Sequence, residues 1–307
     1  MNLESPFPGD TVTTSAAARV VRGIDELRAA LAPARREGRA IGLVPTMGFL
    51  HDGHISLLRA ARAENDLVVM SLFVNPTQFG PNEDLDRYPR DEERDLRLAS
   101  EAGVDLVFAP DVAELYPDGA ATAVEVTGGL TSVLDGDPGR RGPGHFHGVT
   151  TIVAKLFNIV GPDVAYFGQK DAQQAMVIKR MVRDLDFPVR VEVMPIVREE
   201  DGLAMSSRNV YLEPDDRARA VAISRALAAC EQQAITRGSL EAGLEAARIE
   251  LAAVNLEPEY LEARDAETLE RVEGLTGRPI LIAVAAKVGA ARLIDNVVID
   301  PPTGTTK

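Results

Sequence analysis

The chain has no tryptophan, four histidines and a single cysteine, Cys230, in its 307 residues. A lone cysteine cannot form a disulfide within one chain, and this is typical of a protein that stays in the reducing cytoplasm. Cys230 falls in an alanine-rich segment with a helical pattern, where a small buried side chain is expected rather than a nucleophile. We therefore predict a cytoplasmic protein whose chemistry does not use its thiol.

Long apolar runs and a surplus of basic residues are also missing. No apolar run approaches the roughly 20 residues that cross a bilayer, so no membrane partner is expected. Residues 1–17 lack the cationic start and apolar core of a signal peptide and are interpreted as a flexible N-terminal extension. The net charge is −14, which argues against nucleic acid as a partner because such binding leaves a basic footprint. A local basic pocket for a nucleotide is still compatible with this charge.

Apolar segments alternate with helical patterns up to about residue 197. Helices are expected at 24–37, 54–64, 91–102, 148–160 and 171–184. Strands are expected at 40–45, 67–74, 104–108, 163–167 and 189–194, with a further extended segment at 123–127. Strands this apolar are buried on both faces, as in a parallel sheet covered by helices. The alternation predicts an α/β fold, with a Rossmann-like doubly wound parallel sheet over residues 18–197.

The pattern changes after residue 197. Two helical runs are followed by three strands, and these elements are expected at 215–236, 239–253, 258–263, 279–286 and 291–299. Helices followed by consecutive strands indicate a smaller C-terminal α+β domain with an antiparallel sheet, over residues 198–307. The Gly- and Pro-rich stretch at 135–144 is expected to be a mobile loop rather than a linker between domains.

Two of the four histidines lie between a predicted strand and a predicted helix, in the sequence His51-Asp-Gly-His54. Such junctions bind phosphates in α/β proteins, because the first N–H groups of a helix are unpaired and the helix dipole favours anions. Paired imidazoles there can donate hydrogen bonds to phosphate oxygens that gain charge in a transition state. Gly48 and Gly53 allow the backbone to approach a ligand closely.

The spacing of the two histidines alone is as compatible with two ordinary surface or core histidines as it is with a phosphate-binding site. A zinc site is disfavoured, because metalloprotease histidines are four residues apart in His-Glu-x-x-His and no third histidine is near in the sequence. The interpretation as a nucleotide site therefore depends on the residues at the other strand ends.

Polar side chains follow the ends of two further predicted strands. Asn75 and Gln78 offer neutral donors and acceptors to hydroxyl or amine groups. Lys170 lies at a helix start, where a cation is unfavourable unless it faces a phosphate, and the neighbouring Asp171 also has the features of an N-cap. Because ligands of open α/β sheets bind at the carboxyl ends of the strands, we expect these side chains to share one site.

Two loops add to this picture. Ser206, Ser207 and Arg208 combine two hydroxyls with a guanidinium, which forms a cradle for an anion. The segment 83–90 mixes charges with a tyrosine. It is either a solvated loop or a lid that closes over substrate to exclude water.

In this order, the segments resemble the motifs of the pantothenate synthetase family over roughly residues 20–300. The matching segments are Pro45-Thr-Met-Gly-Phe-Leu-His-Asp-Gly-His54, Phe73-Val-Asn-Pro-Thr-Gln-Phe79, Asp86-Arg-Tyr-Pro-Arg90, Gly144-His-Phe-His-Gly-Val149, Phe167-Gly-Gln-Lys-Asp171, Gly202-Leu-Ala-Met-Ser-Ser-Arg-Asn209 and Ala291-Arg-Leu-Ile-Asp-Asn296. Three features depart from the family pattern: Gln169 stands where glutamate is usual, Ala172 replaces a common aromatic, and the 135–144 loop is longer than usual.

The resemblance implies an enzyme that makes pantothenate from (R)-pantoate, β-alanine and ATP. The reaction passes through a pantoyl adenylate and releases pyrophosphate and then AMP. The residues expected to carry the chemistry are His51, His54, Lys170, Ser206, Ser207 and Arg208, with His54 as the general acid by resemblance. A homodimer is expected on the same basis.

The resemblance also distributes the binding roles. ATP is expected at Pro45, Met47, Gly48, Phe49, Leu50, His51, Asp52, Gly53, His54, Gly168, Gln169, Lys170, Asp171, Val197, Met205, Ser206, Ser207 and Arg208. Pantoate and β-alanine are expected at Asn75, Gln78, Tyr88, His145 and Gln174. Mg²⁺ is expected to bridge the phosphate oxygens of ATP, with Asp95 or Asp171 as outer partners.

Other functions are compatible with single motifs. Phosphopantetheine adenylyltransferase and cytidylyltransferases share the histidine turn, but they are not expected to combine the 75–78 and 168–171 segments. Class I aminoacyl-tRNA synthetases pair a similar turn with a Met-Ser loop, yet the short chain and its acidic charge disfavour a tRNA partner. A non-catalytic nucleotide sensor is the alternative from another class, because a fold alone does not settle function.

Overall fold

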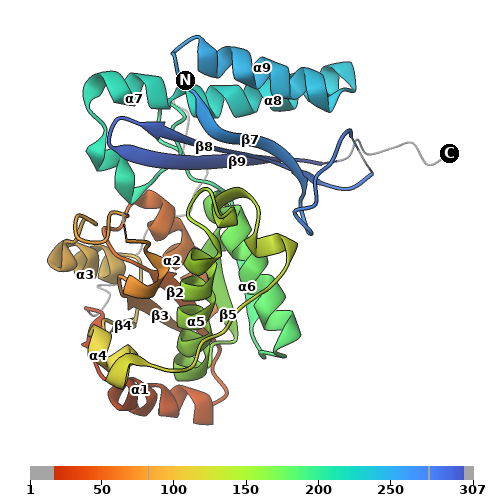
Figure 1. Cartoon of the computed structure of the whole chain (residues 1–307). Helices are drawn as coiled ribbons and strands as arrows, with labels where there is room; N and C mark the ends of the chain where they lie inside the picture. Colours follow the sequence, from red (N-terminus) through yellow and green to blue (C-terminus); the bar gives the residue numbers. More distant parts are fainter. Residues whose placement is uncertain (1–16, 82, 276, 301–307) are drawn as a thin grey trace, which may run out of the picture.

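The computed structural model describes residues 17–81, 83–275 and 277–300. Within these ranges the chain forms a six-stranded and a three-stranded sheet (Figure 1). The predicted N-terminal extension lies, except for Ala17, outside the described residues. In the described part, no helix is long and apolar enough to cross a membrane.

The larger sheet is parallel throughout, with strand order β1-β4-β3-β2-β5-β6. Its strands are β1 (Arg19–Val21), β2 (Ile41–Thr46), β3 (Leu67–Leu72), β4 (Leu106–Phe108), β5 (Val164–Gly168) and β6 (Arg190–Met194). From β2 the chain moves outward through β3 and β4, and β5 then pairs with the other edge of β2. This reversal places a crevice at the carboxyl ends of β2 and β5, where open α/β sheets bind ligands.

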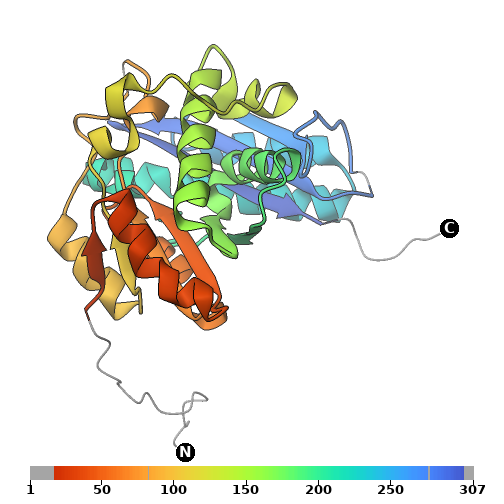
Figure 2. The same cartoon turned by 90° about the horizontal axis from the view of Figure 1, so that it is seen from below.

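Helices cover both faces of this sheet. One face packs against α1 (Ile24–Arg36), α5 (Pro143–Val160) and α6 (Ala172–Asp184), which Figure 2 shows side by side. The other face packs against α2 (Asp52–Glu64) and α3 (Glu92–Glu101), and the short α4 (Val112–Leu115) follows β4. The predicted doubly wound α/β arrangement is confirmed.

The smaller sheet is antiparallel, in the order β7-β8-β9. Its strands are β7 (Pro258–Asp265), β8 (Ile280–Val288) and β9 (Ala291–Ile299), preceded by α7 (Pro214–Ala220), α8 (Ala222–Arg237) and α9 (Leu240–Ala252). Ile280 and Ile282 face α8 and α9, whereas Leu281 and Ala283 pack against Leu134 of the first domain. Both faces of β8 are buried, which explains its almost entirely apolar sequence. The α+β prediction is confirmed, and a boundary at residue 197 stays a prediction.

Several element boundaries differ from the predictions. The helix expected at 54–64 begins at Asp52, and the helix expected at 148–160 begins at Pro143, so His54 and His145 both lie inside helices. The run at 215–236 is divided into α7 and α8. The extended segment 123–127 belongs to neither sheet, and β1 has no predicted counterpart because three residues are too few to show a period.

The stretch 135–144 was expected to be a mobile loop, and the structure ties its first residue to the C-terminal domain. The carboxylate of Asp135 accepts hydrogen bonds from the Arg292 guanidinium (2.9 and 3.2 Å) and from the Tyr260 hydroxyl (2.8 Å). These partners come from β9 and β7, so the stretch is clamped to the C-terminal domain. They lie 157 and 125 residues away along the chain, and no local sequence pattern could reveal them.

Candidate active site

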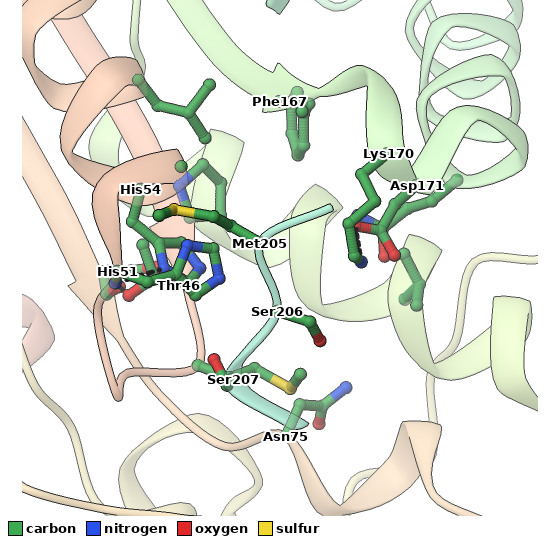
Figure 3. Close-up of a pocket in the computed structure, with 18 of the residues that line it drawn as sticks. Thr46, His51, His54, Asn75, Phe167, Lys170, Asp171, Met205, Ser206 and Ser207 are labelled. Atoms are coloured by element: carbon green, nitrogen blue, oxygen red, sulfur yellow. Dashed lines mark hydrogen bonds and ion pairs between the residues drawn. The ribbon is translucent and has the colours of Figure 1, made fainter. Parts of the chain in front are cut away.

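A cavity opens at the carboxyl edge of the parallel sheet, over the crevice between β2 and β5. Its walls come from the turns after β2, β3, β5 and β6, from one face of α5, and from the segment Met205–Arg208. Figure 3 shows His51 and His54 on one side and Lys170 and Asp171 on the other. The Met205–Ser207 segment lies between them in this view.

His51 is the N-cap residue of α2, and His54 lies in the first turn of that helix. The two ring centroids are 4.0 Å apart, with the rings tilted by 37°. The backbone N–H of His51 donates to His54 Nδ1 at 3.3 Å. Since Nδ1 accepts, the proton of the neutral His54 ring is on Nε2.

Both imidazoles are held in their neutral form. Burial, reinforced by the nearby Lys170 ammonium, lowers the pKa of His51 to about 4. Burial also lowers the pKa of His54 well below its ordinary value, with smaller contributions from His51 and Lys170. A neutral imidazole ring carries one N–H group, which can donate a hydrogen bond. A Cβ at residue 53 would come within 2.9 Å of the His51 ring, so a larger residue there would displace that ring.

Asp95 of α3 fixes the turn that precedes these histidines. Its carboxylate accepts the backbone N–H groups of Phe49 and Leu50, both at 2.7 Å. Phe49 and Gly48 have φ values of 51° and 84°, and a Cβ on Gly48 would come within 2.9 Å of the Asp95 carboxylate. Burial raises the pKa of Asp95, and the two N–H groups counteract this.

Asp95 is only 1% exposed and does not line the cavity. Both of its oxygens serve the turn at Phe49 and Leu50. The structure therefore corrects the expectation that Asp95 is an outer partner of Mg²⁺. Its geometry is that of a group that positions the histidine turn.

A buried cluster of amides follows β3, at the 3₁₀ turn η1 (Pro76–Gln78). Asn75 Nδ2 donates to Gln78 Oε1 (3.2 Å), and Asn75 Oδ1 accepts from the Tyr116 hydroxyl (2.8 Å). Gln78 Nε2 contacts the sulfur of Met47 at 3.1 Å. Asn75 and Gln78 thus reach the cavity with their orientations fixed by protein partners.

The turn after β5 forms η5 (Gln169–Asp171). Lys170 Nζ lies 3.2 Å from Asp171 Oδ2, and both side chains line the cavity. The Gln169 side chain instead bonds to Asn296 of β9 (3.3 Å), and Asn296 Nδ2 donates to the carbonyls of Gln169 (2.9 Å) and Lys170 (3.0 Å). The C-terminal domain therefore orients the turn that carries the lysine.

The Ser206–Arg208 segment links both sides of the cavity. Ser207 Oγ donates to the carbonyl of Phe49 (3.2 Å), which ties this segment to the histidine turn. The Arg208 guanidinium forms two bonds, of 2.8 and 2.9 Å, with the Asp84 carboxylate. Asp84 belongs to the predicted lid at 83–90, so that segment is docked on the cavity in this structure.

The sequence matches the family model described as pantoate-beta-alanine ligase over residues 19–298. This chain belongs to the pantoate–β-alanine ligase family. It is 55% identical over 288 residues to the pantothenate synthetase of Acetivibrio thermocellus, covering 92% of this chain and 99% of the relative. The pantothenate synthetase of Moorella thermoacetica is 54% identical over 292 residues, with coverages of 92% and 98%.

Two solved structures agree with this family assignment. The pantothenate synthetase of Thermus thermophilus superposes with a TM-score of 0.86 at 51% identity, covering 92% of this chain and all of that one. The pantoate-beta-alanine ligase of Francisella tularensis, complexed with beta-gamma ATP and beta-alanine, gives a TM-score of 0.76 at 34% identity, with coverages of 94% and 99%.

The cavity of this ligase-family protein brings most of the predicted residues together. The predicted residues that line it are Pro45, Met47, His51, Gly53, His54, Asn75, Gln78, Tyr88, Gly168, Lys170, Asp171, Gln174, Val197, Met205, Ser206, Ser207 and Arg208. Gly48, Phe49, Leu50, Asp52, Gln169, His145 and Asp95 do not line it. Leu50 is buried in the core, Phe49 lies against the Arg94 guanidinium, and Asp52 is exposed.

His145 was expected to bind pantoate or β-alanine; it does not line the main cavity, and its role stays a prediction. Its Nδ1 lies 2.8 Å from the carbonyl of Gln78, and its Nε2 lies 3.2 Å from Arg141 Nη1. Both ring nitrogens are therefore engaged by protein atoms, and His145 lines a smaller neighbouring pocket that shares Lys170, Asp171 and Gln174 with this cavity.

Sequence reasoning missed a group of mainly apolar residues in the wall: Thr46, Leu57, Ser71, Phe73, Val149, Ile152, Val153, Leu156, Phe167, Pro195 and Ile196. The strand-end rule could have found Ser71, Phe73 and Phe167, because they lie at the carboxyl ends of β3 and β5. The residues from α5 repeat with helical spacing and are indistinguishable in sequence from a core-facing stripe.

Proposed function

We propose that this chain condenses (R)-pantoate with β-alanine at the expense of ATP, giving pantothenate, AMP and pyrophosphate through a pantoyl adenylate. The observation that carries the proposal is one cavity in which two neutral imidazoles and Lys170 face the Ser206–Arg208 segment. Buried amides lie on the same wall. The family assignment supports the same reaction.

In the first half-reaction the pantoate carboxylate attacks the α-phosphorus of ATP. A carboxylate oxygen–phosphorus bond forms, and the bond from the α-phosphorus to the bridging oxygen breaks, so pyrophosphate leaves with the electron pair. The carboxylate is already ionised and needs no general base. The protein has to align the two reactants and to stabilise negative charge on the leaving group.

We assign that stabilisation to the N–H groups of His51 and His54, to Lys170 and to Arg208, with Ser206 and Ser207 on the phosphates. The depressed pKa values make the free imidazoles donors of hydrogen bonds rather than cations. This revises the role of His54 from a general acid to a donor fixed at the N-terminus of α2, where unpaired N–H groups also face an anion.

We assign the pantoate hydroxyl and carboxylate groups to Gln78 and Gln174, with Asn75 and Tyr88 beside them. Amides suit this position because a charged partner is costly to desolvate next to apolar walls. Apolar side chains of α5, Val149 and Ile152 among them, line the same cavity.

In the second half-reaction the neutral amine of β-alanine attacks the acyl carbon of the adenylate. A carbon–nitrogen bond forms, AMP leaves with the electrons of the carbon–oxygen bond, and the amine loses a proton. Positioning and exclusion of water dominate this step, because water would hydrolyse the mixed anhydride. We propose that the docked 83–90 segment and the C-terminal domain provide that shield.

Mg²⁺ belongs to the proposal because it would neutralise charge on the ATP phosphates. The donor set fits a metal held through the nucleotide, since the described residues contain no group of three or more His, Cys, Asp or Glu side chains suited to a metal ion. Asp171 lines the cavity and its side chain is 46% exposed, so it would act as the outer carboxylate. A homodimer and a cytoplasmic location complete the proposal.

The test of the reaction is pantoate-dependent exchange of labelled pyrophosphate into ATP. The proposal expects exchange that requires pantoate and not β-alanine, followed by release of AMP when β-alanine is added. A nucleotide sensor on the same fold would give no exchange, and an adenylyltransferase for another substrate would not respond to pantoate.

Gln78→Ala tests the placement of pantoate. We expect the KM for pantoate to rise by about 10- to 100-fold, because the substrate loses a hydrogen bond in a buried site, while the KM for ATP changes little. Gln232→Ala, on the exposed side of α8, is the control. Equal increases in both KM values would contradict the placement.

A further inference from the structure

A chain of hydrogen bonds runs beside the cavity from Glu83 to Gln78. The Arg141 guanidinium bonds the Glu83 carboxylate through Nη2 (2.6 Å) and Nε (3.2 Å). Arg141 Nη1 also lies 3.2 Å from His145 Nε2. His145 Nδ1 then lies 2.8 Å from the main-chain carbonyl of Gln78. The 83–90 segment and the turn that carries the side-chain amide of Gln78 are thus connected.

The partners of His145 determine its protonation. A carbonyl can only accept, so Nδ1 carries the proton and donates to Gln78. Arginine can only donate, so Nε2 is the unprotonated acceptor of Arg141. Burial and the Arg141 charge lower the pKa of His145 to about 4, which keeps the ring in this neutral form. The His145 ring is therefore a donor at Nδ1 and an acceptor at Nε2.

Helix α5 seats the Gln78 turn closely on the same side. A Cβ on Gly148 would come within 2.5 Å of the Thr77 carbonyl and 2.6 Å of the Gln78 backbone. Asn75 Nδ2 donates to the carbonyl of Gly148 at 3.1 Å. His145 and Gly148 lie three residues apart on one face of α5, so both hold the backbone of η1 from the same direction.

We propose that His145 is a positioning residue for Gln78, the residue assigned to pantoate. It fixes the backbone of Gln78 and connects that turn, through Arg141, to Glu83 of the 83–90 segment. The inference rests on the proposed function of Gln78 and goes beyond it, because His145 does not line the main cavity and would act through Gln78. A small displacement of a positioning group is costly to a reaction that depends on alignment. Through the same connection, closure of the 83–90 segment would also affect the position of Gln78.

Two substitutions of His145 separate its two hydrogen bonds. The amide nitrogen of His145→Asn occupies a position near Nδ1 and keeps the donor to Gln78, but it does not reach Arg141. The longer side chain of His145→Gln reaches the position of Nε2 and offers Arg141 an acceptor, but it withdraws the donor from Gln78. A general packing defect would affect both variants alike.

The experiment measures KM for pantoate and for ATP in the pyrophosphate exchange. His145→Gln is expected to raise the KM for pantoate about tenfold, as the loss of one buried hydrogen bond implies, with the KM for ATP within about twofold. His145→Asn is expected to stay within about threefold of the unmodified protein for both substrates. Equal effects of the two variants, or equal effects on the two substrates, would overturn the proposal.

A third variant covers the case in which neither His145 variant folds, judged by far-ultraviolet circular dichroism. Glu83→Gln removes the charge that pairs with Arg141 at the start of the hydrogen-bond chain, and it is expected to raise the KM for pantoate about threefold. Glu93→Gln, at an exposed position of α3, is expected to leave the KM for pantoate unchanged. No difference between these two variants would overturn the connection to the 83–90 segment.

A readout that does not depend on turnover separates this inference from the proposed function. Nitrogen-15 spectra of labelled histidine should show His145 protonated at Nδ1 in the full-length protein. A ring protonated at Nε2 would overturn the inference even if exchange is seen. The Nδ1-protonated form together with no exchange would instead overturn the proposed function and leave only the hydrogen-bond chain from Glu83 to Gln78 standing.

Discussion

The two segments that meet at the cavity are held in place by different kinds of interaction. The histidine turn is fixed by the buried Asp95 carboxylate, which binds two backbone N–H groups, and by Leu50 in the core. The Ser206–Arg208 segment is fixed by an ion pair to Asp84 and by one hydroxyl bond to the backbone. Salt screens partly exposed ion pairs much more than buried hydrogen bonds.

The difference between these interactions matches the catalytic roles proposed for the histidine turn and for the Ser206–Arg208 segment. Donors that stabilise charge in a transition state are most effective when they are already oriented, because no reorganisation is then needed during the reaction. A segment that admits ATP and then closes on it must instead be able to move. We therefore propose that the histidine turn is the preorganised part and that the Ser206–Arg208 segment is the adjustable part.

The largest expected effect comes from removing a preorganised donor. His54→Ala should lower kcat by about 10²- to 10⁴-fold, because a hydrogen bond to the developing phosphate charge is lost in a site with little water. The measurement is the rate of pyrophosphate exchange at saturating substrates. His147→Ala, at an exposed position outside the cavity, serves as the control. A near-normal rate for His54→Ala would remove this residue from the mechanism.

An intermediate effect is expected from loosening the support of the histidine turn. Asp95→Ala leaves the N–H groups of Phe49 and Leu50 without their acceptor and should lower the free energy of unfolding by about 2 kcal/mol, with a loss of kcat. Urea denaturation monitors the stability. Asp95→Asn keeps one acceptor and should lose less. If both variants were as stable as the unmodified protein, the turn would not depend on this carboxylate.

The smallest effect is expected at the adjustable segment. Asp84→Asn weakens the ion pair with Arg208, which is only partly buried, and should raise the KM for ATP about two- to fivefold. The difference from the unmodified protein should shrink as salt is added. Glu26→Gln breaks an exposed pair with Arg19 and should leave KM unchanged. An effect of Asp84→Asn as large as that of His54→Ala would remove the distinction between the two segments.

Local sequence patterns predicted the parts of the molecule that depend on local physics. The apolar runs of β2, β3 and β5 are buried on both faces of a parallel sheet, and this pattern is visible in the sequence. The polar residues at the ends of these strands, such as His54, Gln78 and Lys170, could be assigned to one site because parallel strands place their carboxyl ends at the same edge.

The parts that sequence reasoning missed depend on distant partners. Asp135 lies in a Gly- and Pro-rich stretch that resembles a mobile loop, yet Arg292 and Tyr260 clamp it from the other domain. Asp95 was expected near the metal, but its carboxylate binds the backbone of a turn 45 and 46 residues earlier. His145 lies beside the cavity but bonds to Gln78 and Arg141.

The pH dependence of kcat/KM for ATP tests most directly whether the imidazoles act as neutral, preorganised donors. This ratio reports groups of the free enzyme, in which the pKa of His51 is about 4 and that of His54 lies well below its ordinary value. Both rings therefore stay neutral at the ordinary histidine pKa of about 6.5, and the ratio of kcat/KM between the unmodified protein and His54→Ala should stay constant as the pH crosses that value. A ratio that rises as the pH falls through about 6.5 would show that a protonated His54 is required and would contradict the account.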